Sequence, residues 1–390
     1  MNPQSQFCHN PHCPARGQTG KGNIVIHSRK EKRYRCTTCK GTFTATIGTP
    51  FYRLHTAMDV VTVVLTLLAH GCPRQAIVAA FGVDERTVAE WQSRAGEHAR
   101  KVHEHLVETG RVHLQHVQAD EIWVKMIGKK VWLAMAIEVP TRLWLGGVVS
   151  CRRSKSLIWE LMKHVRAVAC LCSGCLSGGL LVCVDGFRAY VKAVQHAFRV
   201  PLRTGRRGRP KLLTPQGLML GQVVKQYQYA AHGAAHGHVV GVTRRVLLGT
   251  HTAIKEALGR TGTGSDINTA YIERLNATFR AMLVPLVRRG RALARTSAQL
   301  SAQMWLVGVS YNFCWEHRAL RQVAILGGQV RVQGRTPAMA AGLADHPWTL
   351  GELLAYQVPP PVSIAPKRRG RPPKPRLSQV AQIPRLRLAA

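Results

Sequence analysis

From residue 112 onward, the hydrophobic pattern is that of a β-sheet with a helix between two of its strands. Short apolar runs that suit strands lie at 112–120, 131–137, 143–149 and 180–184. The segment 156–168, between the third and fourth runs, has the spacing of an amphipathic helix. The fourth run is apolar throughout, as expected for a central parallel strand that is covered on both faces. We therefore expect an α/β domain with a mixed sheet over residues 111–320.

Residues 51–110, which precede this domain, have a helical pattern instead. One helix is expected from Asp59 to His70 and a second from Arg74 to Ala80. A tight turn at Gly82 then leads to a third helix that Asp84 would cap. Short helices joined by a glycine turn are typical of a helix-turn-helix. The alternative is an ordinary helical hairpin in a core.

The order of the strands has a consequence for two acidic residues. Three strands, a helix and a further strand resemble a ribonuclease-H-like domain, in which the first and fourth strands lie side by side. Asp120 ends the first strand and Asp185 ends the fourth, so this fold would bring their carboxylates together. Adjacent side chains of a strand face opposite sides. We favour Asp120 for the site and expect Glu121 either to support it from behind or to face the solvent.

Acidic residues are scarce, which makes their placement informative. The chain has 19 Asp and Glu against 55 Lys and Arg, a net charge of +36, and Asp185 is the only acid from Leu161 to Lys255. A carboxylate at the end of an apolar strand is costly unless a cation meets it there. Three isolated carboxylates, Asp120, Asp185 and Glu273, therefore indicate a site for Mg²⁺ or Mn²⁺ that acts on a polyanion.

Glu273 lies at the start of a helical pattern and has two interpretations. Asn276 and Arg280 share its helical face, since they follow it by three and seven positions. Arg280 would then contact a DNA phosphate or orient Glu273. In the other interpretation Glu273 is a helix-surface acid that pairs with Arg274 or Arg280.

The first 50 residues carry a strong metal-binding pattern. The chain has 11 cysteines, and four of them form two short knuckles, Cys8 with Cys13 and Cys36 with Cys39. Two such knuckles predict a zinc ribbon in which four thiolates hold one Zn²⁺. His9 and His12 are substitute ligands, although the four cysteines already complete a tetrahedral shell.

Two further groups of metal-binding residue types carry a weaker signal. Cys170, Cys172 and Cys175 lie in a loop rich in glycine and serine and have no clear fourth ligand, so we expect loop thiols. The segment with His232, His236 and His238 is rich in glycine, and we expect a solvated hairpin loop rather than a metal site.

The high positive charge favours a nucleic-acid partner, with an anionic membrane surface as the weaker alternative. The third helix would face the major groove, and two Gly-Arg-Pro segments resemble peptides that lie in the minor groove. The expected DNA contacts are Arg86, Arg94, Arg207, Arg209, Arg280, Arg369 and Arg371. A solvated basic linker is the alternative for both Gly-Arg-Pro segments. The second of them lies in a proline-rich tail, 358–390, which follows a short helical extension at 321–357.

Three motifs resemble those of one known family. They are Gln118–Trp123, Val184–Phe187 with Tyr190, and Tyr271–Arg280. Together with the ribbon and the helical region, they are similar to transposases of the insertion-sequence-one type. The resemblance implies a DDE transposase with a ribonuclease-H-like core and the acidic triad Asp120, Asp185 and Glu273. The segment between the second and third acids is longer than in short members of that family, so an insertion is expected at about 200–263.

A transposase would bind double-stranded DNA, namely the ends of its element and a target, and we expect a homo-oligomer on that DNA. The longest apolar stretch, 60–69, is too short to span a bilayer, and the first residues lack the pattern of a signal peptide. We therefore expect no membrane partner and a cytoplasmic, nucleoid-associated protein of a prokaryote. A DNA-binding regulator and a metal-dependent nuclease without joining activity are the alternatives.

Overall fold

The computed structural model describes residues 1–170, 179–202, 208–228, 238–287, 293–326 and 329–360. The N-terminal part is a small unit of short elements. They are η1 (Pro3–Ser5), β1 (Ile24–Ser28), β2 (Arg33–Cys36) and β3 (Thr42–Thr44). The three strands pair antiparallel in the order β1-β2-β3. Tyr34 and Phe43 are buried between the strands and the cysteine-bearing turns, so this unit has a core of its own.

Three helices follow, as the sequence predicted: α1 (Met58–Ala69), α2 (Arg74–Phe81) and α3 (Glu85–Leu106). Gly82 ends α2 in the left-handed conformation with φ of 63°, and Asp84 caps α3 by accepting a hydrogen bond from the backbone N–H of Arg86. However, α3 is 22 residues long, and its middle packs against α9 (Ser297–Phe313). A side-chain carbon at Gly96 would lie 2.2 Å from the carbonyl oxygen of Ala302, so only glycine permits this approach. The helix-turn-helix therefore stays a prediction beside the alternative of a packed helical hairpin.

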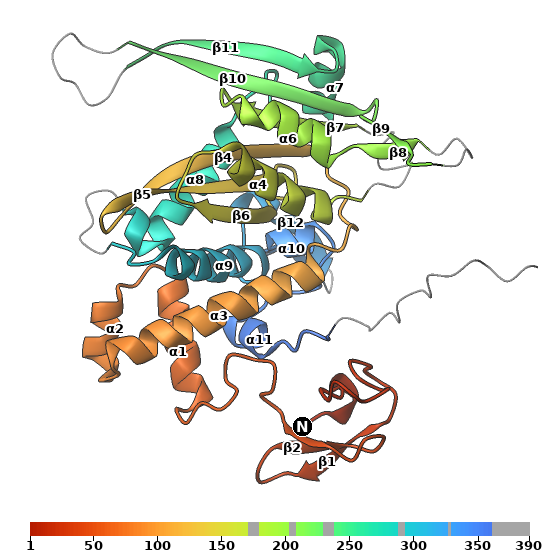
Figure 1. The fold of residues 1–390 in the computed structure, drawn as a ribbon, viewed down its shortest axis with the longest axis vertical. Coiled ribbons are helices and arrows are strands. Elements are labelled where there is room, and N and C mark those ends of the chain that lie inside the picture. The colour runs from red at the N-terminus through yellow and green to blue at the C-terminus, as the bar shows by residue number, and fades with distance from the viewer. Residues whose placement is uncertain (171–178, 203–207, 229–237, 288–292, 327–328, 361–390) are drawn as a thin grey trace, which may run out of the picture.

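A six-stranded mixed sheet forms the centre of the molecule and confirms the expected α/β class (Figure 1). Its strands are β4 (His116–Met126), β5 (Lys129–Glu138), β6 (Trp144–Ser150), β7 (Leu180–Asp185), β10 (Leu218–Gln228) and β11 (His238–Leu248). Their order across the sheet is β11-β10-β7-β4-β5-β6. β7 runs parallel to both of its neighbours, β4 and β10, and the other pairs are antiparallel.

Helices cover both faces of this sheet (Figure 1). They are α4 (Lys155–Val168), α6 (Ala189–Ala197), α7 (His251–Thr261) and α8 (Ala270–Met282), together with α9. Adjacent glycines of β6 show the division, because Gly146 faces His164 of α4 while Gly147 faces Met304 of α9. On β7, Leu181 and Cys183 pack with α7, in a cluster separate from the main core. Side chains that alternate along a strand therefore reach different helices.

The segment 200–263, where the sequence predicted an insertion, contains both a small hairpin and parts of the main sheet. It does contain additional structure, since β8 (Val200–Leu202) and β9 (Lys211–Leu213) form a small hairpin. It also supplies β10, which pairs with β7 inside the main sheet, and α7, which covers one of its faces. The sequence pattern gave no order for these strands because pairing depends on contacts between distant segments. The first strand also differs from the expectation, since β4 begins at His116 and continues through Met126.

The C-terminal part packs against α3 and contacts the N-terminal unit. After η2 (Val284–Leu286) and α9, it contains η3 (Arg318–Leu320), β12 (Gln322–Leu326), β13 (Gln329–Gln333), α10 (Pro337–Ala340) and α11 (Leu350–Ala355). The expected helical extension thus includes a β-hairpin as well. The carbonyl of Leu353 is bonded to His98 of α3, and Gln357 donates to the carbonyls of Ala45 and Ile47. Among the described helices, none is both long and apolar enough to cross a membrane.

Candidate metal centres

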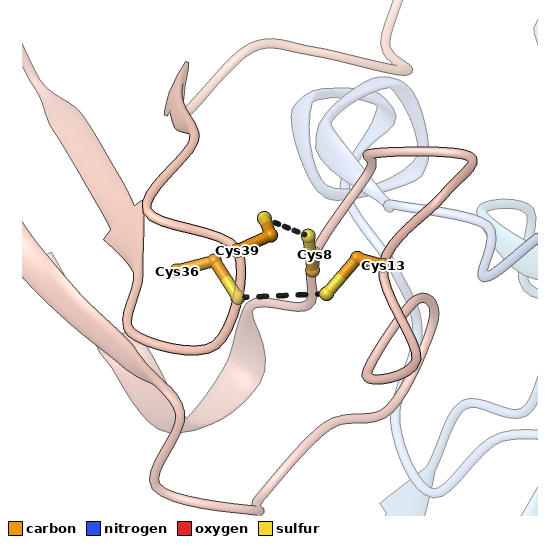
Figure 2. A group of neighbouring side chains, drawn as sticks. All are labelled: Cys8, Cys13, Cys36 and Cys39. Atoms are coloured by element: carbon orange, nitrogen blue, oxygen red, sulfur yellow. Dashed lines mark hydrogen bonds between the residues drawn. The ribbon is translucent and has the colours of Figure 1, made fainter.

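Four cysteine sulfurs converge at one end of the N-terminal unit (Figure 2). The sulfurs of Cys8 and Cys39 are 3.6 Å apart, and those of Cys13 and Cys36 are 3.9 Å apart. All four lie within 4.8 Å of one another. A tetrahedral zinc ion with Zn–S bonds of about 2.3 Å requires sulfurs about 3.8 Å apart. The predicted cluster is therefore confirmed as a group, and its spacing fits one Zn²⁺.

Tight turns bring these thiols together. The N–H of Cys13 bonds to the carbonyl of Asn10, and the N–H of Cys36 bonds to the carbonyl of Gly41. His9, considered as a substitute ligand, instead packs its ring against Phe7 at 4.5 Å. Burial lowers the pKa of His9 to about 4. This histidine is therefore neutral at physiological pH and belongs to the small core rather than to the group of thiols.

A second group of ligand atoms lies where β7 ends beside the middle of β4. Ala119 of β4 pairs with Val184 of β7, so the next residues, Asp120 and Asp185, follow at equivalent positions. Carboxylate oxygens of Asp120, Glu121 and Asp185 lie within 4.8 Å of one another. The two aspartates therefore meet as the sequence predicted, and Glu121 joins them.

Asp120 is held between two hydrogen-bond donors. Asn276 of α8 donates to Asp120 Oδ2 at 2.8 Å, and the N–H of Glu121 donates to its Oδ1 at 2.9 Å. Burial and the neighbouring charge of Asp185 raise the pKa of Asp120 to about 7. The negative charge of Asp120 is thus costly in the protein alone and would be stabilised by a bound cation.

Glu121 points to the opposite face of the sheet, toward α6. Its side chain is buried, it forms an ion pair with Arg153, and it accepts a hydrogen bond of 2.8 Å from the hydroxyl of Tyr190. Burial and the charge of Asp185 raise its pKa. The solvent-facing interpretation of Glu121 was therefore wrong, and the supporting position is the observed one. Strand alternation gave the face correctly but did not reveal Arg153, whose position just before α4 carries no motif.

Asp185 is fixed by its own turn and by Arg153. The N–H of Phe187 donates to Asp185 Oδ1 at 3.0 Å, and the Arg153 guanidinium donates to Oδ2 at 2.9 Å. That guanidinium also lies 4.4 Å from the centre of the Phe187 ring. On the neighbouring strand, Gln222 donates to the Asp185 carbonyl at 2.9 Å. Arg153 therefore links Glu121 and Asp185 and partly neutralises both.

Glu273 lies further from the group but lines the same cavity. This cavity, of about 500 Å³, is bordered by Asp120, Asp185 and Glu273 and by cationic side chains. Glu273 forms an ion pair of 2.7 Å with Lys225 of β10 and accepts a hydrogen bond of 2.9 Å from Thr269. Its carboxylate is not among the three that lie within 4.8 Å of one another. The third predicted acid thus faces the site across the cavity, paired with a lysine that sequence reasoning did not identify.

The residues of this cavity fit a hard divalent cation. Carboxylate oxygens are the ligands that Mg²⁺ and Mn²⁺ prefer, and two or three of them converge here. Beside Asp120, the buried amide oxygen Oδ1 of Asn276 has no hydrogen-bond partner among the described residues. An unsatisfied oxygen next to crowded carboxylates is the environment that a cation or its bound water stabilises. The residues around Asp120 and Asp185 are therefore compatible with a site for divalent cations.

The predicted DNA contacts fall into separate places. Arg86 is exposed on the first turn of α3, whereas Arg94 bonds to the carbonyl of Tyr52 and pairs with Glu90. Arg209 is exposed and lies between β8 and β9, and Arg280 is half-buried on α8. The predictions for Arg207, Arg369 and Arg371 lie outside the described residues, as do those for Cys172, Cys175, His232 and His236. His238 begins β11 and is exposed, and Cys170 is half-buried.

Comparison with protein-family models and with curated proteins finds no match for this chain. The two candidate metal centres therefore stand on their own geometry.

The thiol group predicts one zinc ion per chain. Replacing Cys36 by Ser should abolish stoichiometric zinc and unfold the N-terminal unit, because so small a core depends on its metal. Cys151→Ser is the matched control, since Cys151 is exposed and lies far from the group in sequence. Zinc measured by plasma mass spectrometry on the purified full chain tests this. Equal zinc content in both variants would contradict the assignment.

Proposed function

We propose that this protein is a metal-dependent DNA strand-transfer enzyme, a transposase of the DDE class. The observation that carries the proposal is the meeting of Asp120 and Asp185 at one cavity in a chain with a net charge of +36. A basic protein with a group of carboxylates at one cavity is suited to bind a polyanion and place a metal beside it.

The sheet order supports this proposal. If the strands of the sheet are numbered along the chain from β4 as the first to β10 as the fifth, their order across the sheet is 3-2-1-4-5. The second strand, β5, is antiparallel to the first, β4. A ribonuclease-H-like core has this order, and its acids lie on the first and fourth strands. Asp120 on β4 and Asp185 on β7 correspond to these positions, and Glu273 follows on α8, a helix that packs against β4 and β5.

The chain's own residues would do most of the positioning. Asp120 and Asp185 would hold the divalent ions, with Glu273 on the other side of the cavity. Bound Mg²⁺ would activate the attacking water or 3′-hydroxyl and stabilise the leaving oxygen. Asn276 orients the Asp120 carboxylate through its hydrogen bond to Oδ2. Lys225 and Arg153 line the cavity as cations, where they would meet phosphate oxygens of the bound strand.

Recognition of DNA would lie outside this cavity. The candidate zinc ribbon and the α2–α3 turn supply compact structures before the sheet, and Arg86 is exposed at the start of α3. An exposed first turn of a helix can reach base edges in the major groove. Arg94 is occupied by Tyr52 and Glu90, so it is a weaker candidate for a base contact than Arg86.

Replacing Arg86 by Ala should weaken binding to the element's own ends more than binding to random DNA, because base contacts carry specificity. Fluorescence anisotropy on both duplexes at one salt concentration measures the difference. Arg100→Ala is the control, since Arg100 is exposed on the same helix and already pairs with Glu104. If Arg86→Ala loses equal affinity for both duplexes, α3 does not read sequence.

Asp120→Asn, Asp185→Asn and Glu273→Gln should each abolish Mg²⁺-dependent cleavage and joining while DNA binding is retained. Each change removes a carboxylate that would hold or face the metal, whereas affinity for DNA comes mainly from the basic surface. Cleavage and strand transfer of a labelled element end, measured on one gel, give both activities. Glu256→Gln is the matched control, because Glu256 is an exposed acid of α7 that does not line the cavity.

Glu121→Gln separates the two neighbouring carboxylates of β4. Both oxygens of Glu121 already have partners in Arg153 and Tyr190, so its replacement should lower activity without abolishing it. An inactive Glu121→Gln beside an active Asp120→Asn would move the catalytic role to Glu121. Cleavage without joining in the unmodified protein would favour a nuclease. Full activity in all three variants of the proposed triad would contradict this assignment of the site, and absence of cleavage by the unmodified protein would leave the DNA-binding regulator.

A further inference from the structure

A second cavity lies on α8, away from the acidic group. It has a volume of about 500 Å³ and is bordered by parts of β5, α8, α9 and η3. Its charged and aromatic lining consists of Arg142, Tyr271, Arg274, Tyr311, His317 and Arg318. Among the described residues, no acid lines it. This composition differs from that of the first cavity, where acids and cations alternate.

Three guanidinium groups reach this cavity without a carboxylate partner in the described part of the chain. Ion pairs between described residues include other arginines, such as Arg74, Arg100 and Arg153, but not Arg142, Arg274 or Arg318. Three neighbouring cations repel one another in the free protein. An anion that entered the cavity would remove this repulsion and gain charge-assisted hydrogen bonds.

Arg142 is the most firmly positioned of the three. It occupies the β5–β6 turn with φ of 60°, a conformation that few residues other than glycine adopt. Its guanidinium lies 4.1 Å from the centre of the Tyr271 ring and donates to the carbonyl of Val139. The buried carboxylate of Glu138 accepts hydrogen bonds from Thr141, which fixes the turn. The turn therefore holds a cation over an aromatic ring at the edge of the cavity.

The neighbouring aromatic groups supply shape rather than charge. Tyr311 is buried, and the His317 ring lies 4.8 Å from it, edge to face. Burial and the charge of Arg142 lower the pKa of His317, so this imidazole is neutral at physiological pH. The positive charge of the cavity thus comes from its arginines, which stay protonated at all physiological pH values.

We propose that this cavity is a phosphate-binding site, in which Arg142, Arg274 and Arg318 hold a phosphate mono- or diester. Guanidinium groups bind two phosphate oxygens at once, and the half-exposed Tyr271 offers an apolar surface for a sugar or base. A backbone phosphate of DNA and a free pyrophosphate or nucleotide share this chemistry. The site does not depend on catalysis. Arg274 directly follows Glu273, so α8 lines both this cavity and the acidic one.

The test replaces Arg274 and Arg318 by Ala, singly and together. Both side chains are exposed, so their loss should leave the fold intact. Arg321→Ala is the matched control, because Arg321 is exposed, follows Arg318 by one turn and does not line the cavity. The full, zinc-loaded chain is titrated without added Mg²⁺ or Mn²⁺, so that cleavage plays no part. A random duplex at several salt concentrations and inorganic pyrophosphate are the two separate ligands.

For a DNA phosphate, each Ala substitution should weaken duplex binding by about tenfold, the loss expected when a charge-assisted hydrogen bond is removed. The slope of log affinity against log salt should also fall by about one for each arginine that is replaced. A loss confined to pyrophosphate would support the same site with a small phosphate ligand. Duplex and pyrophosphate affinities that match those of Arg321→Ala would overturn the proposal. Because no outcome involves cleavage, the result is separate from the fate of the proposed transposase activity.

Discussion

Crowding of carboxylates at the centre of the sheet is the constraint on which the rest of the structure depends. Asp120, Glu121 and Asp185 place oxygens within 4.8 Å of one another, with Glu121 buried and the two aspartates partly buried. Such an arrangement is unfavourable unless cations and hydrogen-bond donors surround it. Arg153 and Asn276 supply part of this compensation, and the raised pKa of Asp120 shows that it is incomplete. A fold that keeps this arrangement gains the capacity to bind a divalent cation.

The surrounding elements can be understood as means of holding these carboxylates in place. The parallel pairing of β4 with β7 sets the two aspartates side by side, and alternation along β4 sends Glu121 to the other face. Gln118 of β4 accepts hydrogen bonds from the N–H groups of Tyr271 and Ile272, which fixes the first turn of α8 to the same strand. The position of Glu273 thus follows from a contact between β4 and α8.

Local patterns in the sequence predicted the elements better than their assembly. Apolar runs located β5, β6 and β7, and cysteine spacing located the thiol group, because each depends on neighbouring residues. The place of β10 in the sheet was missed, since strand order is set by contacts between distant segments. The partners of Glu121 were missed for the same reason, since Arg153 and Tyr190 lie on other elements. The phosphate-binding cavity joins four elements and has no contiguous motif, so no local pattern could indicate it.

Binding of Mn²⁺ to the zinc-loaded protein tests the central claim most directly. Electron paramagnetic resonance at pH 8, above the pKa of about 7 that Asp120 has in the folded chain, measures the free ion. We predict saturable binding to the unmodified protein and to Glu256→Gln, and its loss in Asp120→Asn and Asp185→Asn. Binding should also weaken at pH 5.5, where Asp120 is protonated. Absence of binding to the unmodified protein, or equal binding to Asp185→Asn, would contradict a metal centre between these strands.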